Sequence, residues 1–385
     1  MKILKCIVIS ILALLLLAIL GLYLTGNEHV LKGVANTYLK GKKGPSIDEH
    51  EIFHNRPIAN KVHDEWTYAD NFSELSNEQS AYHEKYGSVA FVVVHKGKIV
   101  AEKYWDDYEE GTISNSFSMS KSIVSLLAGI AIDQGKIKSL DDKVSAYISE
   151  LKGSDKENIK LKHLITMTSG IDFGESYSDP FGFQAKTYYG DDLFEKTLEY
   201  PLSKEPGSEY LYQGGNTLLL AKAIENAVGK PISEYAQEMV WQKIGAEHNA
   251  LWNLDDEDGF EKASCCFYAT ARDFARLGEL YLCHGMWKEE QVVSSEWVQN
   301  SIKPINVPDT SGANTRTYGY QWWLYDHGDL KTYSMRGMLG QYVIVLPEKE
   351  IVIVRLGRSR PDLGNNKERL DFIKYVEMGL ELSES

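Results

Sequence analysis

Strand-forming runs at both ends of the chain, with a long helical stretch between them, are the feature that most restricts the fold. Residues 89–94 and 99–104 are rich in β-branched and aromatic side chains and flank a short turn, which predicts a β-hairpin. Similar runs return at residues 318–324, 342–346 and 351–356. A sheet completed by both ends of the chain predicts an α+β fold in which an antiparallel sheet is flanked by helices.

The middle of the chain is predicted to be helical. Residues 217–228, 232–244 and 269–283 carry apolar side chains at helical spacing. We therefore expect one domain over residues 61–382, with an all-helical subdomain at about 136–300. A final amphipathic helix is expected over about 367–382.

The N-terminus predicts a membrane segment. Lys2 and Lys5 precede residues 6–24, which carry no charge and are close to the length that spans a bilayer. No small-x-small cleavage site follows directly, so an uncleaved single-pass anchor over residues 1–25 is favoured over a cleaved export signal. The two lysines place the domain on the outer side, periplasmic or extracellular, or secreted if the segment is cleaved. Residues 26–60 are polar, contain Gly and Pro, and are expected to be a linker.

Net charge limits the classes of partner, and cysteine content limits the possible disulfides. The formal net charge of −14 disfavours a nucleic-acid partner, which would need a basic face. Cys265, Cys266 and Cys283 are an odd number in the exported part, so no disulfide framework is implied. A bridge to Cys283 and three buried thiols are both open alternatives.

Ser118 and Lys121 are spaced so that the lysine amine can approach the serine hydroxyl. The apolar run at 123–132 predicts a buried helix that starts near Ser118, and Lys121 lies one turn later on the same face. A lysine can activate a serine nucleophile if burial and the helix dipole lower its pKa. A serine at a helix start is also a common N-cap, so the spacing alone does not decide the function.

A zinc site is the competing pattern. His50 and His54 have the spacing of a zinc protease, and Glu74 falls where a third ligand can lie. Pro45 and Pro57 flank the pair and break the helix that would place both histidines on one face. A solvated linker is the favoured interpretation, and no metal or cofactor is expected.

Four segments in order resemble the serine β-lactamase and penicillin-binding-protein superfamily. They are Ser118–Lys121 at a buried helix, residues 161–170, residues 206–212, and residues 337–342 on a strand. The chain is most similar to the class C-related branch that includes the 6-aminohexanoate-dimer (nylon-oligomer) hydrolases. The resemblance covers about residues 60–380 and implies a β-lactamase/transpeptidase-like fold. No Gly-x-Ser-x-Gly elbow is present, which disfavours an α/β-hydrolase.

The resemblance also implies roles for individual residues. Ser118 would form an acyl-enzyme, with Lys121 and Tyr212 as proton-transfer groups. The backbone N–H groups of Ser118 and Gln341 would form the oxyanion hole. Tyr177, Met338 and Gly340 would contact the substrate.

Two departures from the superfamily pattern bear on the substrate. The second motif commonly reads Tyr-x-Asn, and here Gly214 stands in place of the asparagine. The third motif commonly begins with Lys or His, and here it begins with Met338, which cannot grip a substrate carboxylate. Cys266 also stands where a glycine is usual at a helix entry. These changes point to a small ester or amide substrate. A β-lactamase or D-Ala-D-Ala carboxypeptidase, and a non-catalytic wall-binding homologue, are the alternatives.

Overall fold

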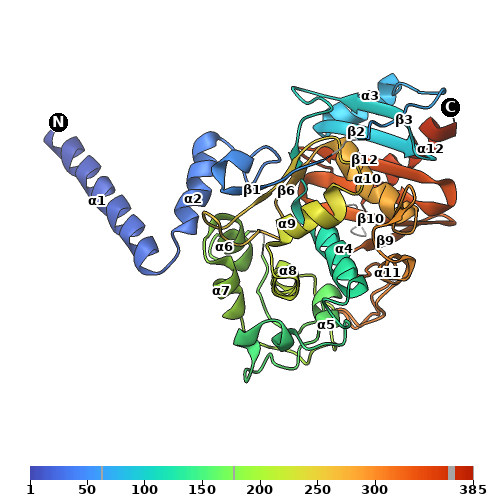
Figure 1. Ribbon diagram of the computed structural model, residues 1–385. Coiled ribbons are helices and arrows are strands. Elements are labelled where there is room, and N and C mark those ends of the chain that lie inside the picture. The colour runs from blue at the N-terminus through green and yellow to red at the C-terminus, as the bar shows by residue number, and fades with distance from the viewer. Residues whose placement is uncertain (62–63, 177, 363–368, 385) are drawn as a thin grey trace.

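The computed structural model describes residues 1–61, 64–176, 178–362 and 369–384. Its largest sheet is antiparallel and six-stranded, in the order β3-β2-β12-β11-β10-β9 (Figure 1). The strands are β2 (Ser88–His95), β3 (Lys98–Tyr104), β9 (Trp323–His327), β10 (Leu330–Gly337), β11 (Gln341–Leu346) and β12 (Ile351–Gly357). Strand β12 pairs with β2, so the two ends of the chain complete one sheet, as the sequence predicted.

Both faces of this sheet are buried, which explains the continuous apolar run of β2. Val92 and Val94 pack into a core beneath α4 (Ser120–Asp133) and α10 (Ala271–Leu282). Phe91 and Val93 pack on the other face against α12 (Leu370–Glu384). Side chains alternate between the faces of a strand, so each face has its own apolar set.

Two C-terminal strands differ from the sequence prediction. Strand β10 was not predicted, and β9 begins at Trp323, near the end of the predicted run at 318–324. The hairpin, β11, β12 and the final helix lie where they were expected.

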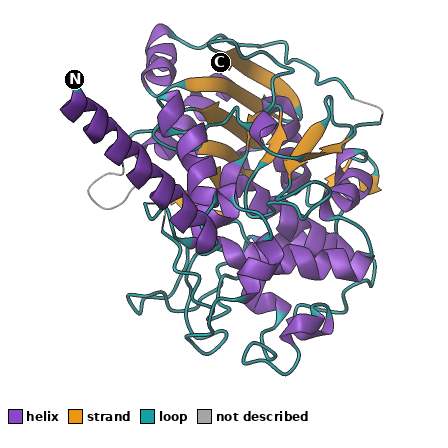
Figure 2. Cartoon of the chain, turned by 90° about the vertical axis from the view of Figure 1, so that its left-hand side faces the viewer, coloured by secondary structure: helices purple, strands orange, loops and turns teal. Residues whose placement is uncertain are grey.

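Helices are the main regular elements of the region 136–300, but they are not its only ones. Its helices are α5 (Leu161–Ile165), α6 (Phe183–Tyr189), α7 (Leu193–Leu198), α8 (Gly214–Val228), α9 (Ile232–Ala236), α10 and α11 (Ser295–Ser301). It also holds β5 (Ala250–Asn253) and β6 (Phe267–Ala269) of a second sheet, and the short pair β7 (Met286–Trp287) and β8 (Glu290–Gln291). The expectation of an all-helical subdomain is therefore wrong. Figure 2 shows the strands gathered at one end of the body, with helices and long loops filling the other.

Residues 26–60 are not a free linker. Helix α2 (His29–Asn36) contacts α6, and Lys32 forms an ion pair with Asp191 at 2.7 Å. Ile47 is fully buried in the main core. Strand β1 (Asn55–Ile58) pairs with β5, some two hundred positions later in the chain. The prediction of a spacer failed because these contacts are remote in sequence.

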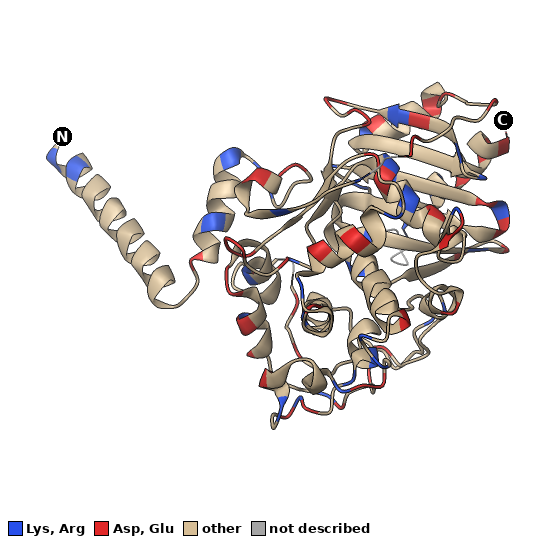
Figure 3. Cartoon of the chain, in the orientation of Figure 1, with Lys and Arg blue, Asp and Glu red and all other residues tan. Residues whose placement is uncertain are grey.

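Helix α1 (Lys2–Leu24) stands apart from the body (Figure 1). None of its residues is buried, and it is long and apolar enough to cross a membrane. Its charges lie at its N-terminal end, and the remainder is uncharged (Figure 3).

Candidate active site

A strained turn presents Ser118 at the start of α4. Strand β4 (Ser114–Asn115) pairs with β6 and leads into a 3₁₀ turn, Phe117–Met119, which α4 continues. Phe117 has a φ of 44°, a left-handed conformation that costs a non-glycine residue about 1–3 kcal/mol. The buried Asn115 side chain holds it, since its Oδ1 accepts from the Phe117 N–H at 2.8 Å. The Asn115 amide in turn donates to the Tyr268 hydroxyl at 3.0 Å.

Lys121 lies directly against the Ser118 hydroxyl. Its Nζ is 3.0 Å from Ser118 Oγ and donates to the Ser264 carbonyl at 2.6 Å. The lysine is only 3% exposed, whereas Ser118 is half-buried and so can be reached from solvent. The i, i+3 spacing read from the sequence thus becomes a direct contact.

Tyr212 joins this pair from a separate segment, just before α8. Its ring lies 5.2 Å from Lys121 Nζ. Trp323 at 5.2 Å and Tyr318 at 5.8 Å pack against the same ring and fix its orientation. Tyr212, which is distant in sequence, is therefore brought beside the Ser118–Lys121 pair.

The third motif forms a turn and not a continuous strand. Gly337 ends β10, Met338–Gly340 form a 3₁₀ turn, and Gln341 begins β11. A Cβ on Gly337 would lie 2.2 Å from the Ser116 carbonyl oxygen, so a glycine is required for β10 to approach the serine turn. Arg355 fixes the turn by donating to the carbonyls of Leu339 at 2.8 Å and Gly340 at 2.9 Å.

The Gln341 N–H is already bonded within the turn that precedes it. That N–H donates to the Met338 carbonyl, and the fully buried side chain is bonded to the backbone of Gly357. The Met338 N–H opens the 3₁₀ turn and so has no acceptor within that turn. It follows Gly337, the residue pressed against the serine turn, so the geometry favours Met338 over Gln341 as an oxyanion donor.

Arg336, just before Gly337, is turned away from Ser118. Its guanidinium lies 4.4 Å from the ring of Phe372 on α12. Burial lowers the pKa of Arg336 to about 9. Because neighbouring residues of a strand face opposite ways, this cation lies on the face of the sheet away from Gly337 and the serine.

A carboxylate faces the position where the second motif usually has its asparagine. The Gly214 N–H donates to Glu175 Oε2. A Cβ on Gly214 would lie 3.7 Å from that oxygen and 3.3 Å from Ser264 Oγ. Gly214 thus lies between Glu175 and the turn that holds Lys121.

An adjacent-cysteine disulfide lies in that same turn. Cys265 and Cys266 are bonded to each other, and Cys266 has a φ of 67°. The Trp252 indole donates to the Cys265 carbonyl at 3.0 Å. Cys283 is free and exposed, so both alternatives drawn from the sequence, a bridge to Cys283 and three buried thiols, are wrong.

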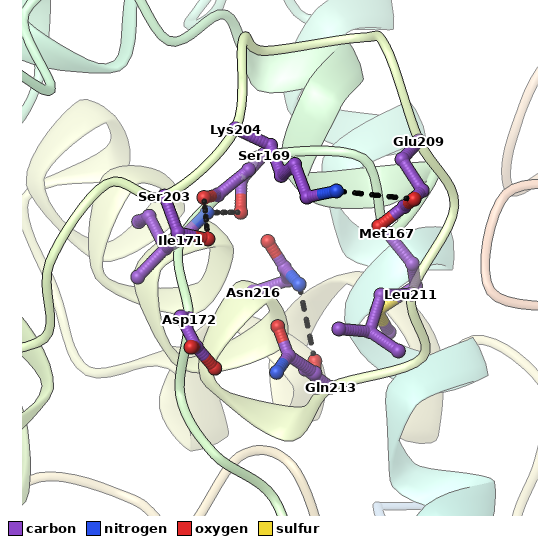
Figure 4. A pocket seen from close by; sticks show the side chains of 11 residues that line it. Met167, Ser169, Ile171, Asp172, Ser203, Lys204, Glu209, Leu211, Gln213 and Asn216 are labelled. Carbon is purple, nitrogen blue, oxygen red and sulfur yellow. Dashed lines mark hydrogen bonds and ion pairs between the residues drawn. The ribbon is translucent and has the colours of Figure 1, made fainter. Parts of the chain in front are cut away.

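A cavity of about 140 Å³ lies behind the Tyr212 segment (Figure 4). Leu211 and Gln213 point into it, while Tyr212, between them, does not line it. Asn216 donates to the Gln213 carbonyl at 3.3 Å, which ties the segment to α8. The cavity is therefore a neighbour of the group formed by Ser118, Lys121 and Tyr212 and is not lined by it. Its lining is Met167, Ser169, Gly170, Ile171, Asp172, Ser203, Lys204, Glu209, Leu211, Gln213 and Asn216.

The remaining sequence candidates are not drawn into this site. Residues His50–Ile52 form a short 3₁₀ turn, with His50 against the Tyr268 ring, while His54 lies 4.0 Å from Asp256. Over the ranges that the structure describes, no group of three or more His, Cys, Asp or Glu side chains is arranged to hold a metal ion. Tyr177 lies outside the described residues.

Comparison with known proteins places the chain in a family. A family profile described as Beta-lactamase matches residues 70–377. The chain belongs to the beta-lactamase family. This confirms the resemblance found in the sequence and makes the chain a serine hydrolase of that family.

Several relatives share most of this beta-lactamase-family chain. The 6-aminohexanoate-dimer hydrolase of Paenarthrobacter ureafaciens is 28% identical over 290 residues, which cover 71% of this chain and 73% of the relative. A protein of Escherichia coli (strain K12) named "Putative D-alanyl-D-alanine carboxypeptidase" is 24% identical over 344 residues, covering 71% and 79%. The structure titled "Putative 6-aminohexanoate-dimer hydrolase from Bacillus anthracis" has a TM-score of 0.73 at 24% identity, covering 87% of this chain and 92% of that one. The structural likeness shows the β-lactamase/transpeptidase-like fold.

Proposed function

We propose that the protein hydrolyses a small ester or amide through a transient acyl-enzyme on Ser118. The observation that carries the proposal is the 3.0 Å contact between Lys121 Nζ and the solvent-accessible Ser118 hydroxyl. A serine is a weak nucleophile unless a base takes its proton, and Lys121 is in reach to do so.

Each step can be assigned to a group at the site. Ser118 Oγ attacks the substrate carbonyl as its proton passes to Lys121. The N–H groups of Ser118 and Met338 stabilise the oxyanion, and such a donor is commonly worth about 10²–10³ in kcat. The C–O or C–N bond then breaks, and the leaving group takes the proton through Lys121 and Tyr212. Water attacks the acyl-enzyme by the reverse route and frees the acid.

Two features favour a plain ester or amide over a β-lactam. Gly214 replaces an asparagine, and Met338 starts the third motif where a cation is common. Arg336 does not replace that cation, since its side chain packs against Phe372. A relative named as a 6-aminohexanoate-dimer hydrolase also supports an amide substrate, because two amino acids are joined by an amide.

A D-alanyl-D-alanine carboxypeptidase is the second candidate. It is favoured by the Escherichia coli relative of that name, which is similar over 71% of this chain. It would need another cation to hold the substrate carboxylate.

Helix α1 is proposed to act as an uncleaved membrane anchor, with the hydrolase domain on the outer side. Its length and apolar composition support this, together with the two lysines at its start. A cleaved signal is the alternative. N-terminal sequencing of the mature protein distinguishes them, since cleavage would remove Lys2–Leu24.

A substrate panel tests the proposed chemistry. p-Nitrophenyl esters, nitrocefin, a D-Ala-D-Ala peptide and an aminohexanoate dimer would be assayed on wild type, Ser118→Ala and Lys121→Ala. A fluorophosphonate probe, read by peptide mass spectrometry, should label Ser118. We expect esters or the amide to be hydrolysed, with activity lost in both variants. Lys222→Ala, which removes a lysine paired with Glu225 on α8, is the matched control and should keep its activity. Full activity in Ser118→Ala would refute the proposal.

A further inference from the structure

We infer that Glu175 makes the site selective for substrates that carry a protonated amine or another strong N–H donor beside the scissile bond. The inference rests on the proposed function and adds a substrate class to it. The carboxylate would accept hydrogen bonds from such a group and repel substrates that carry a carboxylate at the same place.

The position of Glu175 is fixed by the start of α8. Its Oε2 accepts from the N–H of Gly214, which is two residues after Tyr212. A carboxylate can accept about four hydrogen bonds, so holding this N–H is compatible with binding a ligand donor as well.

The absent side chain at Gly214 connects Glu175 to the catalytic group. A Cβ there would lie 3.3 Å from Ser264 Oγ and 3.7 Å from Glu175 Oε2. The Ser264 carbonyl in turn accepts from Lys121 Nζ at 2.6 Å. One chain of contacts therefore runs from Glu175 through Gly214 and Ser264 to Lys121 and Ser118, and the inference places the charged end of a substrate on Ser118 beside this carboxylate.

The charge of Glu175 also acts on Tyr318, a ring that packs against Tyr212. Tyr318, which contacts Tyr212, has a pKa raised chiefly by burial, and the charges of Tyr212, Tyr210 and Glu175 add to the increase. A carboxylate that acts on this phenol also acts on a charged substrate bound against Tyr212.

The opposite wall of the site does not offset this charge. The third motif presents Met338, a thioether, and the Arg336 guanidinium is buried against the rings of Phe372 at 4.4 Å and Trp323 at 5.5 Å, so Trp323 stands between this cation and Tyr212. A cationic substrate is therefore attracted, while an anionic one meets like charge without a counter-ion from these residues. Rejection of the wrong substrate contributes to selectivity as much as attraction of the right one.

Matched substrates and an isosteric variant test the inference. Three p-nitrophenyl esters of equal chain length, with an ω-amino, an ω-methyl and an ω-carboxylate end, would be assayed on wild type and Glu175→Gln. The glutamine keeps an oxygen that can accept from Gly214 but removes the charge. We expect kcat/KM for the amino ester to fall about tenfold, mainly through KM, as for the loss of one charge-assisted hydrogen bond. The neutral ester should change less than twofold, and the carboxylate ester should improve.

Glu209→Gln is the matched control, because Glu209 lines the cavity behind Tyr212 and pairs with Lys204 at 3.4 Å. It should leave the ratio of amino to neutral ester unchanged. The wild-type ratio should also shrink at 1 M salt, which screens charges beyond about 3 Å.

The outcomes separate this inference from the proposed function. Ester hydrolysis that depends on Ser118, with the same amino-to-neutral ratio in wild type and Glu175→Gln, would overturn the role of Glu175 alone. An equal loss on all three esters would also overturn it, since that pattern indicates only a structural role at α8. Hydrolysis that survives Ser118→Ala would overturn the proposed function itself.

Discussion

Replacing Gly337 with alanine should separate the Met338–Gly340 turn from the serine turn. The new Cβ would lie 2.2 Å from the Ser116 carbonyl oxygen and 2.9 Å from Gln341 Cβ. The first contact must open to at least 3.0 Å, and its partner is backbone, so no side-chain rotation can relieve it. Strand β10 and the Ser118 turn must therefore move apart by close to an ångström.

The size of the effect follows from that displacement. A misplacement of about 1 Å can cost roughly 100-fold in rate, and loss of an oxyanion donor costs about 10²–10³. We expect Gly337→Ala to lower kcat about 100-fold on the best ester of the panel, with a smaller change in KM. Overpacking should lower the free energy of unfolding by about 1–3 kcal/mol.

A matched glycine controls for the substitution itself. A Cβ on Gly44 would meet nothing within 4 Å, so Gly44→Ala should keep wild-type kcat and melting temperature. Retention of at least half the wild-type kcat in Gly337→Ala, with an unchanged melting temperature, would refute the contact between β10 and the serine turn.

Three further predictions concern stability and redox state. Burial, with the charges of Arg355 and Lys103, lowers the pKa of His83 to about 3. The unfolded chain therefore binds a proton below pH 6.5 that the folded chain does not, and the free energy of unfolding should fall as the pH drops from 6.5 towards 3, by up to about 1.4 kcal/mol per pH unit. Urea unfolding at pH 5 and 7 should show a smaller difference for His83→Gln than for wild type, and an equal difference would contradict this. Arg355→Met should lower the free energy of unfolding, measured with urea, by several kcal/mol, because each buried carbonyl left without a donor costs about 1–3 kcal/mol. The control Arg316→Met, at an exposed position, should change that free energy little. Alkylation of the denatured, unreduced protein should label Cys6 and Cys283 alone, whereas alkylation after reduction should label all 4 cysteines. Labelling of Cys265 without a reductant would disprove the bridge between Cys265 and Cys266.

The sequence predicts those parts of the site that depend on local geometry. Ser118 and Lys121 are one helical turn apart, so their contact follows from spacing once the apolar run after them is recognised as a helix. Helix α8 and the hairpin β2–β3 were likewise found from periodicity and turn residues.

Contacts between remote backbone segments leave no such signal. Strand β10 was missed because polar residues such as Ser334 and Arg336 interrupt its apolar pattern, although both are buried and Arg336 donates to Ser334 Oγ at 2.9 Å. The sequence interpretation chose Gln341 as an oxyanion donor because it did not foresee the turn before this residue. Leu339 adopts a left-handed φ of 61° there, and a leucine gives no sign of that conformation in the sequence. Ser264 was missed because its carbonyl, and not its side chain, receives Lys121.

The ordered segment after α1 has a geometric consequence for an uncleaved protein. Only residues 25–28 separate the end of α1 at Leu24 from the start of α2 at His29, and α2 is docked on α6. Four extended residues span at most about 14 Å. A bilayer around α1 would therefore hold the α2 face of the body close to the lipid headgroups. The hydrolase domain would therefore stay at a nearly constant distance from the membrane, unlike a domain tethered by a long flexible linker. Its substrates would have to diffuse to the membrane surface.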